Sequence, residues 1–146
     1  MPGNISQVLT DVITVIEAIP APYSVTLSAA AVNAANIPNT TAEKVFAVTV
    51  QTNNTDKFRD GSPGHMRLNH DLTVDLLCRI FPLDQMRGYQ EAIDIEEEII
   101  QALLHQIDLP TYRVLYTRTR RILTSTGEYL ASAIEFSIEQ SLRLPL

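Results

Sequence analysis

The segment Met66–Phe81 alternates apolar and polar residues over sixteen positions, and this pattern constrains the fold more than any other feature. A period of two residues is typical of a β-strand that packs one face on a core. The positions on the predicted core face are Met66, Leu68, His70, Leu72, Val74, Leu76, Cys78 and Ile80. The predicted strand ends at Pro82, because proline has no N–H group to donate to a sheet.

After Asp84 the hydrophobic period changes to that of an amphipathic helix. The predicted apolar stripe consists of Met86, Tyr89, Ala92, Ile93, Ile99, Ile100, Leu103, Leu104 and Ile107. Asp94, Glu97 and Glu98 lie opposite this stripe, so we expect them to face water. A long strand followed by a long helix needs further strands and a second helix to cover it.

The length of the predicted strand is itself informative. Sixteen residues at about 3.3 Å each extend about 50 Å, whereas a typical strand has about 5–6 residues. The surplus length predicts that the strand reaches beyond its own domain. The acidic face of the helix beside it is then a predicted surface for a neighbouring subunit.

The rest of the chain has the patterns of one helix and four strands. The helix is predicted over Ile5–Ile19 and is ended by Pro20 and Pro22. The strands are predicted over Tyr23–Ser28, Lys44–Thr52, Thr111–Leu123 and Glu128–Leu142. The sequence therefore predicts an α+β domain in the order α-β-β-β-α-β-β, with a mostly antiparallel sheet of four to five strands and two helices on one side.

Three points of this prediction stay open. The segment Ala29–Glu43 is read as a loop or a flexible arm, and Asn53–His65 has the turn residues of an exposed loop. Phe58 in that loop either packs back on the domain or meets a partner. The last two strands are expected to form a hairpin, and a β-bulge at Gly127 would change which residues share a face.

Composition limits the class of protein. A chain of 146 residues has the usual size of one domain, so residues 1–146 are predicted to form a single domain with one core. A net charge of −6 argues against a general nucleic-acid binder, whose affinity comes from neutralising phosphates. Cys78 is the single cysteine, so we expect a buried thiol and no internal disulfide.

No targeting or membrane segment is expected. The apolar segment Ile5–Ile19 has no basic region before it and contains Asp11 and Glu17, which argues against a signal peptide. No run approaches the length of about 20 apolar residues that a membrane span requires. The sequence predicts a soluble protein that does not bind a membrane.

Two charged groups are candidate sites. Glu91, Asp94, Glu96, Glu97 and Glu98 are acidic residues of the predicted helix, and a small hydrolase would need one of them buried with a raised pKa. The alternative is an acidic face in water. His65 and His70 show no metal-ligand spacing, and His70 is expected to be buried and hydrogen-bonded. No catalytic, cofactor-binding or metal-binding residue is predicted, so we expect a structural protein rather than an enzyme.

The second group is basic. One predicted strand carries four arginines with Tyr112 and Tyr116 interleaved, and such a strand could bind nucleic acid: Arg113, Arg118, Arg120 and Arg121. An acidic helix and a basic strand in one domain also suit self-association, and this hypothesis places subunit contacts at Glu96, Glu97, Glu98, Arg118, Arg120 and Arg121. The alternative is pairing of Arg118 or Arg120 with Glu135 inside the chain.

The combination of segments resembles the tail terminator proteins of tailed bacteriophages, the minor tail protein U-like or tail-completion family. The resemblance covers roughly residues 5–142. It is carried by the N-terminal helix, the motif His70-x-Leu72-x-Val74-Asp75-Leu76, the helix Ala92–Leu103, and the hairpin segments Gly127–Leu130 and Ile134–Glu139. The segment Ala29–Glu43 departs from the family pattern.

This resemblance implies a virion protein that assembles in the host cytoplasm as a homo-oligomeric ring, usually a hexamer, without a cofactor. The ring caps the tail tube protein, stops tube polymerisation and offers a surface to a neck, connector or stopper protein. DNA passes through the lumen without tight binding. The expected contacts with the tube or neck are Asp56, Lys57, Phe58, Arg59 and Asp60. Another head–tail joining or neck protein of the same fold is the alternative.

Overall fold

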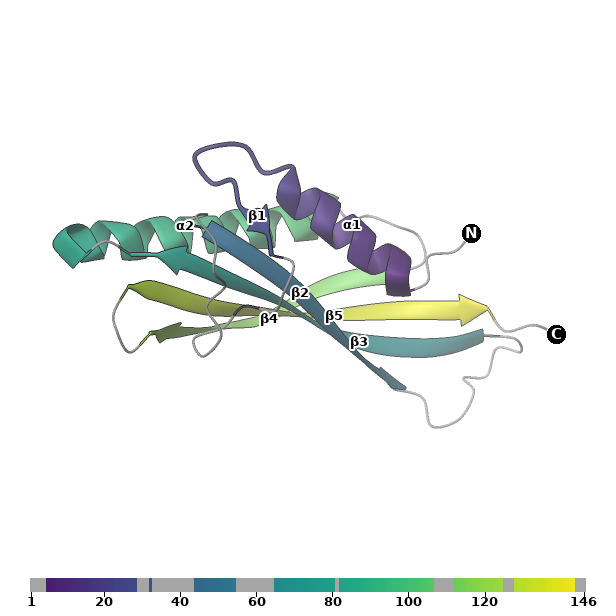
Figure 1. Ribbon diagram of the computed structural model, residues 1–146. Helices are drawn as coiled ribbons and strands as arrows, with labels where there is room; N and C mark the ends of the chain where they lie inside the picture. The colour runs from purple at the N-terminus through teal and green to yellow at the C-terminus, as the bar shows by residue number, and fades with distance from the viewer. Residues whose placement is uncertain are drawn as a thin grey trace.

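The computed structural model describes residues 5–28, 32, 44–54, 65–80, 82–106, 112–124 and 128–143. In these residues, two helices lie on the same face of a five-stranded sheet (Figure 1). The elements are α1 (Ile5–Glu17), β1 (Thr26–Leu27), β2 (Lys44–Asn54), β3 (His65–Arg79), the short 3-10 helix η1 (Pro82–Asp84), α2 (Gln85–Gln106), β4 (Tyr112–Leu123) and β5 (Tyr129–Arg143). The predicted α+β fold and its order of elements are confirmed.

The sheet has the strand order β1-β2-β3-β5-β4. Strand β1 pairs in parallel with β2, and the other pairs are antiparallel. Strand β3 pairs with β5 along its whole length, from His65 opposite Arg143 to Arg79 opposite Tyr129. The long strand thus finds a partner of equal length in its own chain, instead of reaching to a neighbour as the sequence suggested.

The helix-covered face of the sheet carries the core. The predicted alternation in β3 is confirmed, because its side chains from His70 to Cys78 at every second position are buried. They pack with side chains of both helices and of β5, as an amphipathic sheet face requires. The largest members of this cluster are Ile16, Phe46, Leu72, Leu76, Ile80, Ile95, Ile99, Leu103, Leu130, Ile134 and Phe136.

Helix α2 is rotated relative to the predicted stripe. Ala92, Ile99 and Leu103 of the predicted stripe are buried as expected. Ile95, which the stripe omits, is fully buried, whereas Met86, predicted to be core, is 71% exposed. A Cβ atom on Gly88 would lie 3.3 Å from Ile80 Cγ2, so the backbone of α2 lies close to the end of β3 at this point. The spacing Ala92–Ile95–Ile99–Ala102 is the buried stripe, and this rotation also turns Glu96 toward the sheet.

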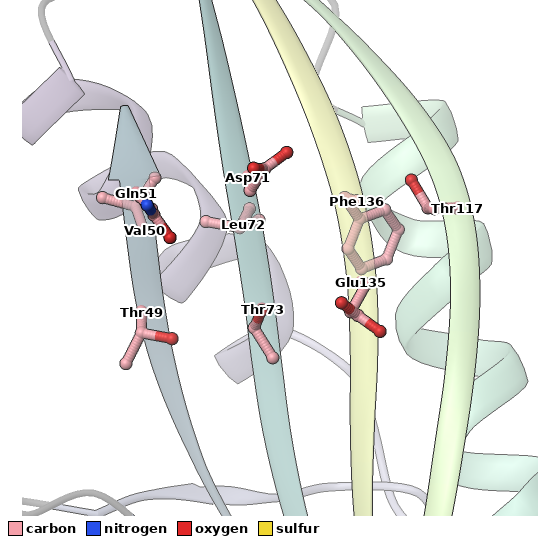
Figure 2. Close-up of a pocket in the computed structure, with 9 residues that line it drawn as sticks. All are labelled: Thr49, Val50, Gln51, Asp71, Leu72, Thr73, Thr117, Glu135 and Phe136. Atoms are coloured by element: carbon pink, nitrogen blue, oxygen red, sulfur yellow. The ribbon is translucent and has the colours of Figure 1, made fainter. Parts of the chain in front are cut away.

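The opposite face of the sheet, called the outer face here, is mostly polar. At one end Val32 packs on Val45, Ala47 and Leu77 in a small apolar cluster. Farther along, Thr49, Thr73 and Glu135 lie side by side on β2, β3 and β5 (Figure 2). An antiparallel sheet with one core face and one solvated face is a common arrangement.

Candidate functional site

Strand β4 contains a β-bulge that decides where its arginines lie. Tyr116 is opposite Phe136 and Arg118 is opposite Glu135, so Thr117 is the additional residue between them. A bulge reverses the alternation beyond it. The bulge at Thr117 therefore determines which residues of β4 share a face with those of β5. The predicted alternative, a bulge at Gly127, lies outside the described residues.

Arg118 and Arg120 lie on the outer face and share one carboxylate. Their Nε atoms donate to Glu135 Oε2 at 2.7 Å and 3.0 Å. The hydrogen bond from Arg118 is the main cause of the lowered pKa of Glu135, and it raises the pKa of Arg118. This is the intramolecular alternative considered above, and it is confirmed for both arginines. Because both guanidinium groups are well exposed, water and salt weaken these pairs.

Arg121 lies on the other face of β4 and reaches Glu96 of α2. Arg121 Nη2 lies 2.6 Å from Glu96 Oε1, and Arg121 Nε donates to both carboxylate oxygens at 2.8 Å and 3.0 Å. Ser132 Oγ donates to Glu96 Oε2 at 2.5 Å. The hydrogen bond to Glu96 is the main cause of the raised pKa of Arg121.

This buried pair changes the predicted subunit contact. The side chain of Glu96 is 1% exposed and that of Arg121 is 35% exposed. Both oxygens of Glu96 are already engaged within the chain, so Glu96 is not presented to a neighbour. The physical reason is the bulge at Thr117, which turns Arg121 inward and supplies the charge that a buried carboxylate needs.

The other acidic residues of α2 form a solvated face, as predicted. Asp94 and Glu97 are exposed, and Glu98 is partly exposed. In the described part of the chain, no group of three or more histidine, cysteine and acidic side chains is placed to hold a metal ion.

Two single residues behave as the sequence predicts. His70 is buried, and its Nδ1 lies 2.9 Å from Thr52 Oγ1. Cys78 is buried as a free thiol, and burial is the main cause that raises its pKa to about 12. A thiol with so high a pKa is a poor nucleophile at neutral pH. The predicted contacts Asp56, Lys57, Phe58, Arg59 and Asp60 lie outside the described residues, as does the segment 29–43 apart from Val32.

A polar hollow of about 390 Å³ lies over the middle of the sheet. Its polar lining comes from the side chains of Thr49, Gln51, Asp71, Thr73, Thr117 and Glu135 (Figure 2). Hydroxyl, amide and carboxylate groups of this kind form hydrogen bonds with water or with a polar partner surface. Glu135 is already paired with two arginines, so its charge is compensated within the chain.

Large apolar side chains gather at the end of the molecule where α2 begins and β4 ends. We call this the apolar end cluster: Leu83, Met86, Tyr89 and Leu123, all of which are exposed. A groove of about 290 Å³ lies between α2 and β4, lined by Gln85, Met86, Tyr89 and Leu123. Sequence reasoning assigned Met86 and Tyr89 to the core and did not single out Leu83. Their position in the sequence could have indicated exposure, because these residues precede the buried stripe of α2.

A scan against models of known protein families and a search of curated proteins give no match to this chain. Within the described residues, no helix combines the length and the apolar character needed to cross a membrane. The surfaces described above are therefore the basis of the functional proposal.

Proposed function

We propose that this chain is a structural subunit of a tailed bacteriophage and assembles into a ring that terminates the tail tube. The observation that carries the proposal is the apolar end cluster. Leu83 is fully exposed, Met86 is 71% exposed and Leu123 is 45% exposed. Met86 and Leu123 line the same groove between α2 and β4. Exposed apolar patches of this kind mark surfaces that bind other proteins.

Covering this cluster in an assembly would favour association. Burying a leucine or methionine side chain completely contributes about 1.5–3 kcal/mol. Several such side chains, contributed by η1, α2 and β4, can together offset part of the entropy lost when subunits associate. The charged residues first expected to hold the ring together are largely satisfied inside the chain, so apolar contact is the better-supported cause of association.

The resemblance to tail terminators supports the proposed position of the ring, at the end of the tail tube. That resemblance implies a hexamer that contacts the tail tube protein on one side and a neck or connector protein on the other. The net charge of −6 and the pairing of Arg118, Arg120 and Arg121 with carboxylates fit a lumen through which DNA passes without being held. The proposed location is the virion, at the junction of head and tail.

Two other classes of function have weaker support. A hydrolase would need a free buried carboxylate, and Glu96, the buried acidic residue of the described helix α2, is paired with Arg121 and Ser132. A nucleic-acid-binding strand would need free arginines, and two of those on β4 share Glu135. A neck or other joining protein of the same particle is the nearer alternative.

Light scattering of the purified chain tests the ring. We expect a mass about six times the chain mass of 16.3 kDa, and ring-shaped particles by electron microscopy. Leu83→Ser should shift the mass to that of one chain, because it removes apolar surface from the cluster. Leu104→Ser is the matched control, because Leu104 is an exposed leucine of α2 outside the cluster. A wild-type protein that remains monomeric up to its solubility limit would contradict the proposal.

A further inference from the structure

A second, largely apolar hollow of about 400 Å³ lies on the outer face of the sheet. It arises because Ala131 and Ala133 of β5 are small, while their neighbours on β4, Ile122 and Arg120, are long. Val32 closes one side of the hollow, and Asp75 of β3 lies on its rim. We call this the outer hollow. It is a preformed, largely apolar recess whose charged lining residues are Asp75, Arg120 and Arg121. Arg121 is held by the buried Glu96, whereas Arg120 is exposed and shares Glu135 with Arg118.

The apolar end cluster has the opposite shape. Leu83 and Met86 project from η1 and the first turn of α2, where the sheet does not cover them. Asp84 and Arg87 flank them. Arg87 lies 3.8 Å from Asp84 and 3.4 Å from Glu91, and all three side chains are at least half exposed. Such contacts are weak in water, so Arg87 and Asp84 are available to exchange partners.

We propose that the apolar end cluster of one copy packs into the outer hollow of the next copy, with Arg87 facing Asp75 and Asp84 facing Arg120. This inference rests on the proposed ring and names its subunit contact. The occupant is a second copy of this chain because the charges complement each other: a basic and an acidic side chain flank the projecting residues, and an acidic and a basic side chain flank the recess.

The state of Asp75 agrees with this arrangement. Burial is the main cause that raises the pKa of Asp75, nearby Arg120 lowers it, and Glu135 raises it further. The charged form of this carboxyl group is therefore incompletely compensated within one copy. A guanidinium group from a second copy would favour the charged form.

The contact would be head-to-tail. Leu83 and Met86 belong to η1 and α2, and α2 lies on the helix-covered face of the sheet (Figure 1). The outer hollow lies on the opposite face, beside Ala131 and Ala133 of β5. Two copies therefore bind through different surfaces, and each copy keeps one surface of each kind for a further neighbour. Heterologous contacts of this type form closed rings when the rotation between copies closes, and open filaments when it does not.

Two charge reversals test the contact: Arg87→Glu on the projecting side and Asp75→Lys on the hollow side. Each variant alone brings like charges together at every contact, so we expect loss of the ring peak in light scattering. When the two variants are mixed one to one, copies of each can alternate around the ring. At every second contact the two introduced residues then meet, and at the others the native Arg87 meets the native Asp75. Each contact therefore joins opposite charges. The mixture should recover the mass of the wild-type ring when the number of copies is even.

Circular dichroism checks that each variant is folded. If Asp75→Lys does not fold, Ala133→Leu replaces it, since a leucine there should fill the outer hollow and abolish assembly without changing charge. Rings that persist in both charge variants would overturn this contact and leave the proposed ring intact. Folded variants that fail to assemble when mixed would also overturn it. A monomeric wild-type protein would overturn the ring and the contact together.

Discussion

Replacing Arg121 with leucine should destabilise the chain by about 3–5 kcal/mol, because it leaves the buried carboxylate of Glu96 without its cation. Replacing Glu96 with leucine should cost less. Arg121 is 35% exposed, so its guanidinium group can turn toward water when its partner is removed. The double variant should recover much of the loss, since two apolar side chains leave no charge uncompensated.

Urea denaturation followed by circular dichroism measures these differences. The variants are best compared in the Leu83→Ser background, because assembly would otherwise add a concentration-dependent contribution to the free energy of unfolding. Equal and small effects for Arg121→Leu and Glu96→Leu, with no recovery in the double variant, would show that the pair does not hold β4 to α2.

Replacing Ile95 with alanine should cost about 2–5 kcal/mol, because Ile95 is fully buried between α2 and the sheet. Met86→Ala should change the free energy of unfolding by no more than about 0.5 kcal/mol, because Met86 is mostly exposed. Both residues lie on α2, so each serves as the control for the other in the same denaturation experiment.

The reverse order of effects would contradict the rotation of α2 seen in the structure. The hydrophobic pattern alone places Met86 in the core and omits Ile95, so this pair distinguishes the structure from the sequence prediction. Met86→Ala should still weaken assembly, since Met86 belongs to the apolar end cluster. An exposed interface side chain is expected to contribute to association and little to the stability of the folded chain.

The strands and helices could be predicted because their periods are local. The alternation of β3 depends on which side chains face the core, and His70, Leu72 and Leu76 lie where the pattern puts them. The rotation of α2 could not be predicted in the same way. A pattern of hydrophobicity assigns every glutamate to water, whereas Glu96 is buried because Arg121 reaches it from a strand distant in sequence.

The position of Arg121 depends in turn on the bulge at Thr117. No glycine or proline marks this bulge, so the alternation of β4 gives no warning that the faces exchange there. The same bulge places Arg118 and Arg120 beside Glu135 on the outer face. One additional residue therefore pairs three arginines within the chain. The proposed interface accordingly centres on the apolar end cluster, with charged residues at its edge.

If a ring of this chain terminates the tail tube, tails assembled without the chain should differ in length, and their length is the most direct test. Electron microscopy of particles from a phage that lacks this chain gives the distribution of tube lengths, with the complemented phage as the control. We predict tubes longer than those of the complemented phage and without attached heads. Tubes of normal length that lack heads would contradict termination and indicate a joining protein of the neck.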